Sequence, residues 1–109
     1  MSDAGTPGMD WRETHRPRFY APVEIEVAGQ KLKTRSQDLS QEGMLVETGE
    51  PLPEGTEFHA RIFIADVDPI EADCVVKRHL RGVGMGVEFV EMSPADRVQL
   101  RKLLAGLPH

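Results

Sequence analysis

The sequence predicts a mostly β domain, in which six antiparallel strands close into a small barrel and one helix follows at the C-terminus. Two observations lead to this fold class. Apolar and polar residues alternate with a period of two through most of the chain, as on strands with one buried face, and a capped helical pattern is confined to residues 93–105. Short turns join the segments, and closing the sheet into a barrel removes its exposed edges.

The strand over residues 20–28 has the clearest alternation. Val23, Ile25 and Val27 lie on one face, and Glu24 and Glu26 lie on the other. This is the pattern of a strand whose one face packs in a core and whose other face meets water. Similar patterns, separated by turns and by a loop rich in proline and glycine at residues 48–55, predict strands at residues 31–37, 44–47, 57–64, 70–80 and 84–90.

Start and stop signals define the helix. Ser93 is the expected N-cap and Pro94 the first helical residue, with Asp96 three residues after the cap. Gly106 and then proline end the pattern. The apolar side of the helix is formed by Val98, Leu100, Leu103 and Leu104.

Length and composition predict a single soluble domain preceded by a short tail. The chain has 109 residues, of which 39% are hydrophobic and 28% charged. Residues 1–10 mix glycine, proline and small polar residues, so we expect a disordered tail, followed at 11–109 by one domain with an arm (11–19), a barrel (20–90) and a helix (93–105). No apolar run approaches the roughly 18 residues of a membrane span and no signal peptide is visible, which favours a cytoplasmic location without membrane insertion.

Charge is distributed unevenly along the chain. The formal net charge is -5, which opposes binding to a nucleic acid polymer. Residues 11–18 nevertheless contain three arginines and one histidine against a single glutamate. A basic arm on an acidic body favours a small anionic ligand.

Two sequence fragments carry the chemistry expected of a phosphate and guanine reader. Arg12 and Arg16 stand four residues apart in the arm, and a guanidinium can bind phosphate oxygens or the O6/N7 edge of guanine through two donors. Asp38, Ser40 and Gly43 follow in a predicted tight turn. The carboxylate can accept from guanine N1 and N2, and the hydroxyl can donate and accept. Gly43 permits either a positive backbone torsion or a close approach of the backbone to the ligand.

The spacing R-x-x-x-R followed by D-x-S-x-x-G resembles the PilZ family of bacterial receptor domains for cyclic di-GMP. The resemblance continues through the segments 43–46 and 83–89 and the closing helix, and covers residues 11–105. It implies a split-barrel fold, no cofactor and a non-enzymatic receptor that binds cyclic di-GMP between the arm and the turn. Ordering of the arm on binding would then alter the interaction with an effector protein.

Two departures from the family pattern leave alternatives open. Trp11 stands where many members carry a further arginine, and its indole can stack on a guanine or pack the arm onto the barrel. Arg18 directly precedes the first strand, where the second motif arginine is sometimes aligned; Thr14 would then occupy the first arginine position. His15, inside the arm, is a further candidate for a pH-dependent phosphate contact.

Other functional classes fit the residues less well. A protein interaction module of the same fold that does not bind the nucleotide is the main alternative. An oligonucleotide-binding barrel would use Trp11, Phe19 and Tyr20 as stacking platforms, but the acidic charge opposes it. Cys74, the single cysteine, alternates with apolar neighbours and is expected to be a buried hydrophobe. The scattered histidines predict no metal site, and no nucleophile, base and orienting group can be assembled into an enzyme.

Overall fold

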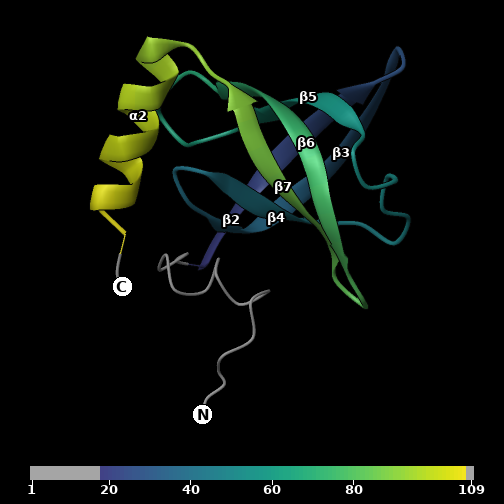
Figure 1. The fold of residues 1–109 in the computed structure, drawn as a ribbon. Coiled ribbons are helices and arrows are strands. Elements are labelled where there is room, and N and C mark those ends of the chain that lie inside the picture. The colour runs from purple at the N-terminus through teal and green to yellow at the C-terminus, as the bar shows by residue number, and fades with distance from the viewer. Residues whose placement is uncertain (1–17, 108–109) are drawn as a thin grey trace.

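The computed structural model describes residues 18–107, which form a closed six-stranded antiparallel barrel with one helix alongside (Figure 1). The predicted fold class is therefore confirmed. The elements in chain order are β2 (Arg18–Val27), β3 (Gln30–Leu39), β4 (Gly43–Glu47), β5 (Glu57–Ile62), β6 (Ile70–Leu80), β7 (Gly84–Glu91) and α2 (Pro94–Ala105).

The strands follow one another around the barrel in the order β2-β3-β4-β7-β6-β5, and β5 pairs with β2 to close it. Four of these neighbouring pairs are consecutive in the chain: β2 with β3, β3 with β4, β5 with β6, and β6 with β7. The loop 48–56 carries the chain from β4 across to β5, so that β4 is left to pair with β7. The strands that carry Arg18, Asp38 and Gly43 are therefore the adjacent strands β2, β3 and β4.

Several boundaries differ from those expected from alternation. β2 begins at Arg18 and not at residue 20, while β5 ends at Ile62 and not at residue 64. β3 continues to Leu39, so Asp38 lies in a strand and not in the predicted turn. The reason is strand pairing, because Asp38 has a register partner on each side, Arg18 in β2 and Leu45 in β4. Local sequence patterns do not report such cross-strand bonds.

The inward faces of all six strands fill the barrel with apolar side chains. Cys74 is fully buried among them, as predicted, and burial raises the pKa of its thiol to about 12. A thiol with that pKa stays protonated and unreactive at neutral pH. The largest fully buried hydrophobic residues are Ile25, Leu39, Met44, Ile62, Ile70, Met85, Leu100, Val23, Val46 and Val76.

A buried serine stabilises an irregularity at the start of β2. The register between β2 and β3 shifts between Arg18 and Ala21, which leaves backbone groups there without a ladder partner. The hydroxyl of Ser36, which is fully buried, donates to the Phe19 carbonyl at 2.8 Å and accepts from the Ala21 N–H at 3.4 Å. Ser36 thus satisfies the polar groups of the bulge that leads into the barrel.

Helix α2 is capped as predicted and is attached to the barrel at two points. The Ser93 hydroxyl accepts from the Asp96 N–H at 3.1 Å, and a carboxylate oxygen of Asp96 accepts from the Glu71 N–H at 3.3 Å. Arg97 donates to the Gln41 carbonyl in the turn between β3 and β4. The expected apolar side is only partly correct, because Leu100 is buried whereas Val98 is 40% exposed. Within residues 18–107, α2 is too short and too polar to span a bilayer.

Candidate functional site

The predicted site residues fall into two groups. Asp38, Ser40, Gly43 and Arg18 are described by the structure, and they come together at the junction of β2, β3 and β4. The other predicted residues lie in the arm, outside the described residues 18–107; they are Trp11, Arg12, His15 and Arg16. The structure therefore describes only the part of the candidate site that the barrel supplies.

Ser40 organises the turn between β3 and β4. Its hydroxyl lies 3.1 Å from the Gly43 N–H and 3.2 Å from the Glu42 N–H, and accepts from both. The same oxygen lies 3.2 Å from the Gly43 carbonyl, while the Ser40 N–H donates to that carbonyl at 2.9 Å. Ser40 is only 4% exposed. Its described contacts hold the turn closed, which is a reason for serine at this position that needs no ligand.

Gly43 lies where β4 approaches β7. A Cβ atom at this position would overlap the backbone carbonyl oxygen of Val87. Any larger residue would therefore push the two strands apart. The motif glycine is required here for close packing of backbones and not for an unusual φ, since Gly43 does not have a positive φ.

Asp38 is a buried carboxylate at the centre of the junction. It is 6% exposed, and its Oδ1 accepts from the Leu45 N–H of β4 at 2.8 Å. On its other side its register partner is Arg18, the first residue of β2. The strand pairing therefore brings Arg18 beside the motif aspartate, whose carboxyl group is held in place by the Leu45 N–H.

A polar cluster extends from this junction over the outside of β2, β3 and β4. We call it the Tyr20 cluster, and it consists of Arg18, Tyr20, Arg35, Gln37 and Glu47. Arg18 Nη1 donates to the Tyr20 hydroxyl at 3.1 Å, and the Arg35 guanidinium lies over the Tyr20 ring, 4.9 Å from its centroid. Such an arrangement is a cation–π contact. Tyr20 remains 49% exposed, so part of its ring is open to solvent.

Glu47 fixes the cluster from β4. Its Oε1 lies 2.9 Å from Arg35 Nε, and its Oε2 accepts from Gln37 Nε2 at 2.6 Å. The hydrogen bond to Arg35, and then the one to Gln37, lower the pKa of the Glu47 carboxyl, while Glu47 raises the pKa of Arg35. Both groups are therefore charged at neutral pH, and both are directed by their partners.

A cleft of about 610 Å³ begins where the Tyr20 cluster ends. Gln37 and Glu47 belong to both, and the opposite side of the cleft is lined by His79 and Arg81 near the hairpin between β6 and β7. His79 Nε2 lies 2.7 Å from the Leu52 carbonyl, which connects that hairpin to the 48–56 loop. Polar surface thus continues from the Asp38 junction across the cluster into the cleft.

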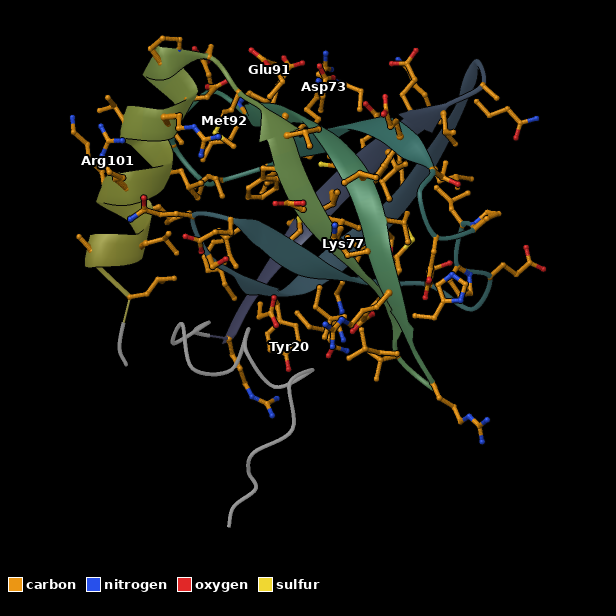
Figure 2. All side chains as sticks on the ribbon, viewed as in Figure 1. Tyr20, Asp73, Lys77, Glu91, Met92 and Arg101 are labelled. Carbon is orange, nitrogen blue, oxygen red and sulfur yellow. The ribbon has the colours of Figure 1, made fainter. Side chains whose placement is uncertain are left out.

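A second charged cluster lies on β5 and β6. Its centre is His59, whose Nδ1 is 2.9 Å from Asp73 Oδ1 and whose Nε2 is 2.7 Å from Glu71 Oε1. Figure 2 shows Asp73 at the end of the molecule opposite Tyr20. Only a protonated imidazole donates from both nitrogens, so the hydrogen bonds to Asp73 and then Glu71 raise the pKa of His59 above its ordinary value of 6.5.

This cluster predicts a pH dependence of stability. Because the pKa of His59 is raised in the folded state, its contribution is fully present below pH 6.5 and is lost as the pH rises through the raised value. The pairs are partly exposed, so the contribution should be less than about 1 kcal/mol. Urea unfolding should be measured at pH 6 and pH 9. The free energy of unfolding of wild type should exceed that of His59→Gln by a larger amount at pH 6 than at pH 9. An equal difference at both pH values would contradict the assignment.

Sequence reasoning missed the partners that organise the site. Ser36, Arg35 and Glu47 were not singled out, although Arg35 and Glu47 stand at outward positions of predicted strands next to the motif. The alternation that places both side chains on the outer face of their strands was the signal available in the sequence. What the sequence could not indicate is which outward residues of β3 and β4 stand side by side, because this depends on the register and on the shift between Ser36 and Asp38.

Comparison with known proteins assigns the fold to a family. The family model of the PilZ domain matches residues 10–106. No curated protein sequence matches the chain.

Solved structures share the fold at low identity. The PilZ domain of YcgR from Escherichia coli, solved with c-di-GMP, is 22% identical, with a TM-score of 0.66 over 84% of this chain and 87% of that one. The PilZ domain of CeSA from a cellulose-synthesizing bacterium is also 22% identical, with a TM-score of 0.64 over 87% and 99%. The inhibitor of motility MotI/DgrA from Bacillus subtilis is 21% identical, with a TM-score of 0.64 over 84% of this chain. The match spans only 51% of MotI/DgrA.

Proposed function

Because this chain belongs to the PilZ domain family, we propose that it is a non-enzymatic receptor for cyclic di-GMP. The observation that supports this most strongly is the pairing of Arg18 with Asp38. It joins the end of the arginine arm to the buried motif carboxylate. The solved complex of the YcgR PilZ domain with c-di-GMP is consistent with a ligand of this kind for this fold.

Covalent geometry limits how far the arm arginines can lie from Asp38. Paired Cα atoms on antiparallel strands are about 5 Å apart, and each extended residue adds about 3.5 Å. Arg16 is two residues before Arg18, so its Cα lies within about 12 Å of that of Asp38. Arg12, six residues before Arg18, can reach across a ligand from the other side. Both arginines of the motif can therefore share one ligand with the aspartate.

The chemistry of cyclic di-GMP matches these groups. Its two phosphodiesters carry negative charge, for which guanidinium groups are the preferred partners. Its guanine bases present N1–H and N2–H donors, for which a carboxylate such as Asp38 is the matching acceptor. In this proposal Ser40 and Gly43 contribute by holding the turn and the β4–β7 approach, as their contacts in the structure indicate.

We further propose that the ligand acts by changing how the arm lies against the barrel. Ligand contacts to Arg12 and Arg16 would hold the arm over β2 and β3, and so change the surface that an effector protein meets. The barrel itself is rigidly paired around its whole circumference. The signal in this proposal is therefore a change of surface at one side of a fixed barrel, read by a separate protein, and no catalytic step is involved.

Calorimetric titration of the wild-type chain tests the proposal, with cyclic di-AMP as the control ligand. The control has the same two phosphodiesters but lacks the N1–H and N2–H donors of guanine. We expect saturable binding of cyclic di-GMP, and binding of cyclic di-AMP weaker by about tenfold or more, because one charge-assisted hydrogen bond is worth about 1.5–3 kcal/mol. Equal affinity for the two ligands would contradict the role given to Asp38.

Thermal melting distinguishes the receptor from a nucleotide-independent docking module of the same fold. A ligand that binds only the folded state raises the melting temperature once its concentration exceeds the dissociation constant. We expect cyclic di-GMP to raise it by roughly 10 °C at about one hundred times that constant. An unchanged melt and no heat of binding at millimolar ligand would reject the receptor and leave the docking module.

A further inference from the structure

The Tyr20 cluster contains an exposed aromatic ring with both a defined position and a defined orientation. One face is covered by the Arg35 guanidinium at 4.9 Å, and the ring is held at its hydroxyl by Arg18 at 3.1 Å. Tyr20 is nevertheless 49% exposed. An exposed aromatic side chain held from two directions differs from a surface residue that merely extends into solvent, because little conformational entropy remains to be lost when a ligand stacks on it.

The guanidinium in this arrangement is also fixed. Arg35 Nε pairs with Glu47 Oε1 at 2.9 Å, and Gln37 holds the other carboxylate oxygen of Glu47 at 2.6 Å. The contact with Glu47 is made at Nε, on the edge of the guanidinium, and so leaves free the face that is not turned toward Tyr20. Side chains from three neighbouring strands therefore hold an aromatic ring and a cation in contact with each other on the barrel surface.

This surface adjoins the proposed ligand site. Tyr20 lies two residues from Arg18, the register partner of Asp38, and Gln37 directly precedes Asp38 in β3. Figure 2 shows Tyr20 at the end of the barrel where β2 begins, away from Asp73 and Glu91. A dinucleotide bound at Asp38 by one guanine would have its remaining parts within reach of the ring.

We infer that Tyr20 and Arg35 form a stacking platform for one base of the bound dinucleotide. The inference rests on the proposed function and adds to it a role for two residues outside both sequence motifs. A base can stack on an aromatic or on a guanidinium face, and the exposed part of the Tyr20 ring, with Arg35 over its other part, provides such a face. Glu47 and Gln37 are positioning residues, because they hold Arg35 and do not themselves contact the base.

Titration with cyclic di-GMP of three variants tests the platform. Tyr20→Leu removes the ring and should raise the dissociation constant about tenfold. Tyr20→Phe keeps the ring and should stay within about twofold of wild type. Phe63→Leu is the matched control, since it makes the same kind of change at another exposed aromatic residue, 38% exposed and just beyond β5, and should not alter binding.

A second measurement uses the unmodified chain. Tyr20 is the only tyrosine, so its ring protons can be followed by NMR without ambiguity. A base stacked on the ring should move these signals upfield at saturating cyclic di-GMP. The platform would be rejected, and the receptor retained, if cyclic di-GMP binds saturably without shifting the ring signals. An equal dissociation constant for Tyr20→Leu and wild type would have the same meaning. Absence of binding by wild type would instead reject the receptor, and the platform with it.

Discussion

Replacing Gly43 with alanine is expected to lower the free energy of unfolding of the barrel substantially. The added Cβ would overlap the Val87 carbonyl oxygen, and its next neighbour would be the Val87 carbonyl carbon at 3.0 Å. Both are backbone atoms in a paired strand, so no flexible side chain can move aside. We expect a loss of about 3 kcal/mol in the free energy of unfolding, and a melting temperature lower by roughly 10 °C or more.

Two further glycines frame this experiment. Gly84, which pairs with Glu47 at the other end of the β4–β7 ladder, would place a Cβ against the Val46 carbonyl oxygen, so Gly84→Ala should have a similar effect. Gly49 is the control, because nothing lies within 4 Å of its Cβ position and its φ is not positive. Gly49→Ala should melt within about 2 °C of wild type. A Gly43→Ala variant as stable as Gly49→Ala would show that β4 and β7 are farther apart than described.

This result bears on how the D-x-S-x-x-G motif is interpreted. If Gly43→Ala loses ligand binding, the cause will be the separation of β4 from β7. Such a loss would therefore not show that Gly43 contacts the ligand. The contacts of Ser40 lie inside the same turn. Within this motif, Asp38 is therefore the residue whose substitution reports most directly on ligand chemistry.

The second large effect is expected from the arm. Arg12→Ala and Arg16→Ala should each raise the dissociation constant for cyclic di-GMP by about tenfold to a hundredfold, the equivalent of one lost charge-assisted contact. Arg18→Ala should weaken binding about tenfold, because it removes a cation beside Asp38. Isothermal titration of each variant, with a melting curve to verify folding, gives these values.

The chain supplies its own control for this series. Arg97 and Arg101 repeat the R-x-x-x-R spacing in α2, and Figure 2 shows Arg101 on that helix, away from Tyr20. Arg101→Ala should bind as wild type does. If Arg12→Ala binds normally and Arg18→Ala does not, the second motif arginine is Arg18 and the assignment to Arg12 and Arg16 is wrong.

Alternation was sufficient to predict the barrel because it directly reflects which side chains face the core. Val23 and Ile25 are buried and Glu26 is exposed, as a period of two requires. The helix start was equally predictable, since Ser93 and Pro94 act within one turn of the chain. In both cases, the physical cause lies within a few residues of its effect.

The parts of the site that could not be predicted depend on pairing across strands. Asp38 was expected in a turn because aspartate favours turns locally, but its partners in β2 and β4 extend the strand past it. Ser36 has no local signature of its role, since the backbone groups that it satisfies are 15 and 17 residues away. The pairing of Arg35 with Glu47 likewise depends on which residues of β3 and β4 are neighbours.

Closure of the sheet by the β5–β2 ladder restricts how another protein can recognise this domain. Within residues 18–107 each of the six strands has a hydrogen-bonded neighbour on both sides over part of its length, so an incoming peptide can add only to stretches beyond these ladders, such as residues 30–35 of β3. Recognition therefore depends mainly on side chains of the outer wall, or on the helix and turns at its ends. A structural change confined to the start of β2 would then be enough to create or remove one docking surface while the rest of the barrel stays unaltered.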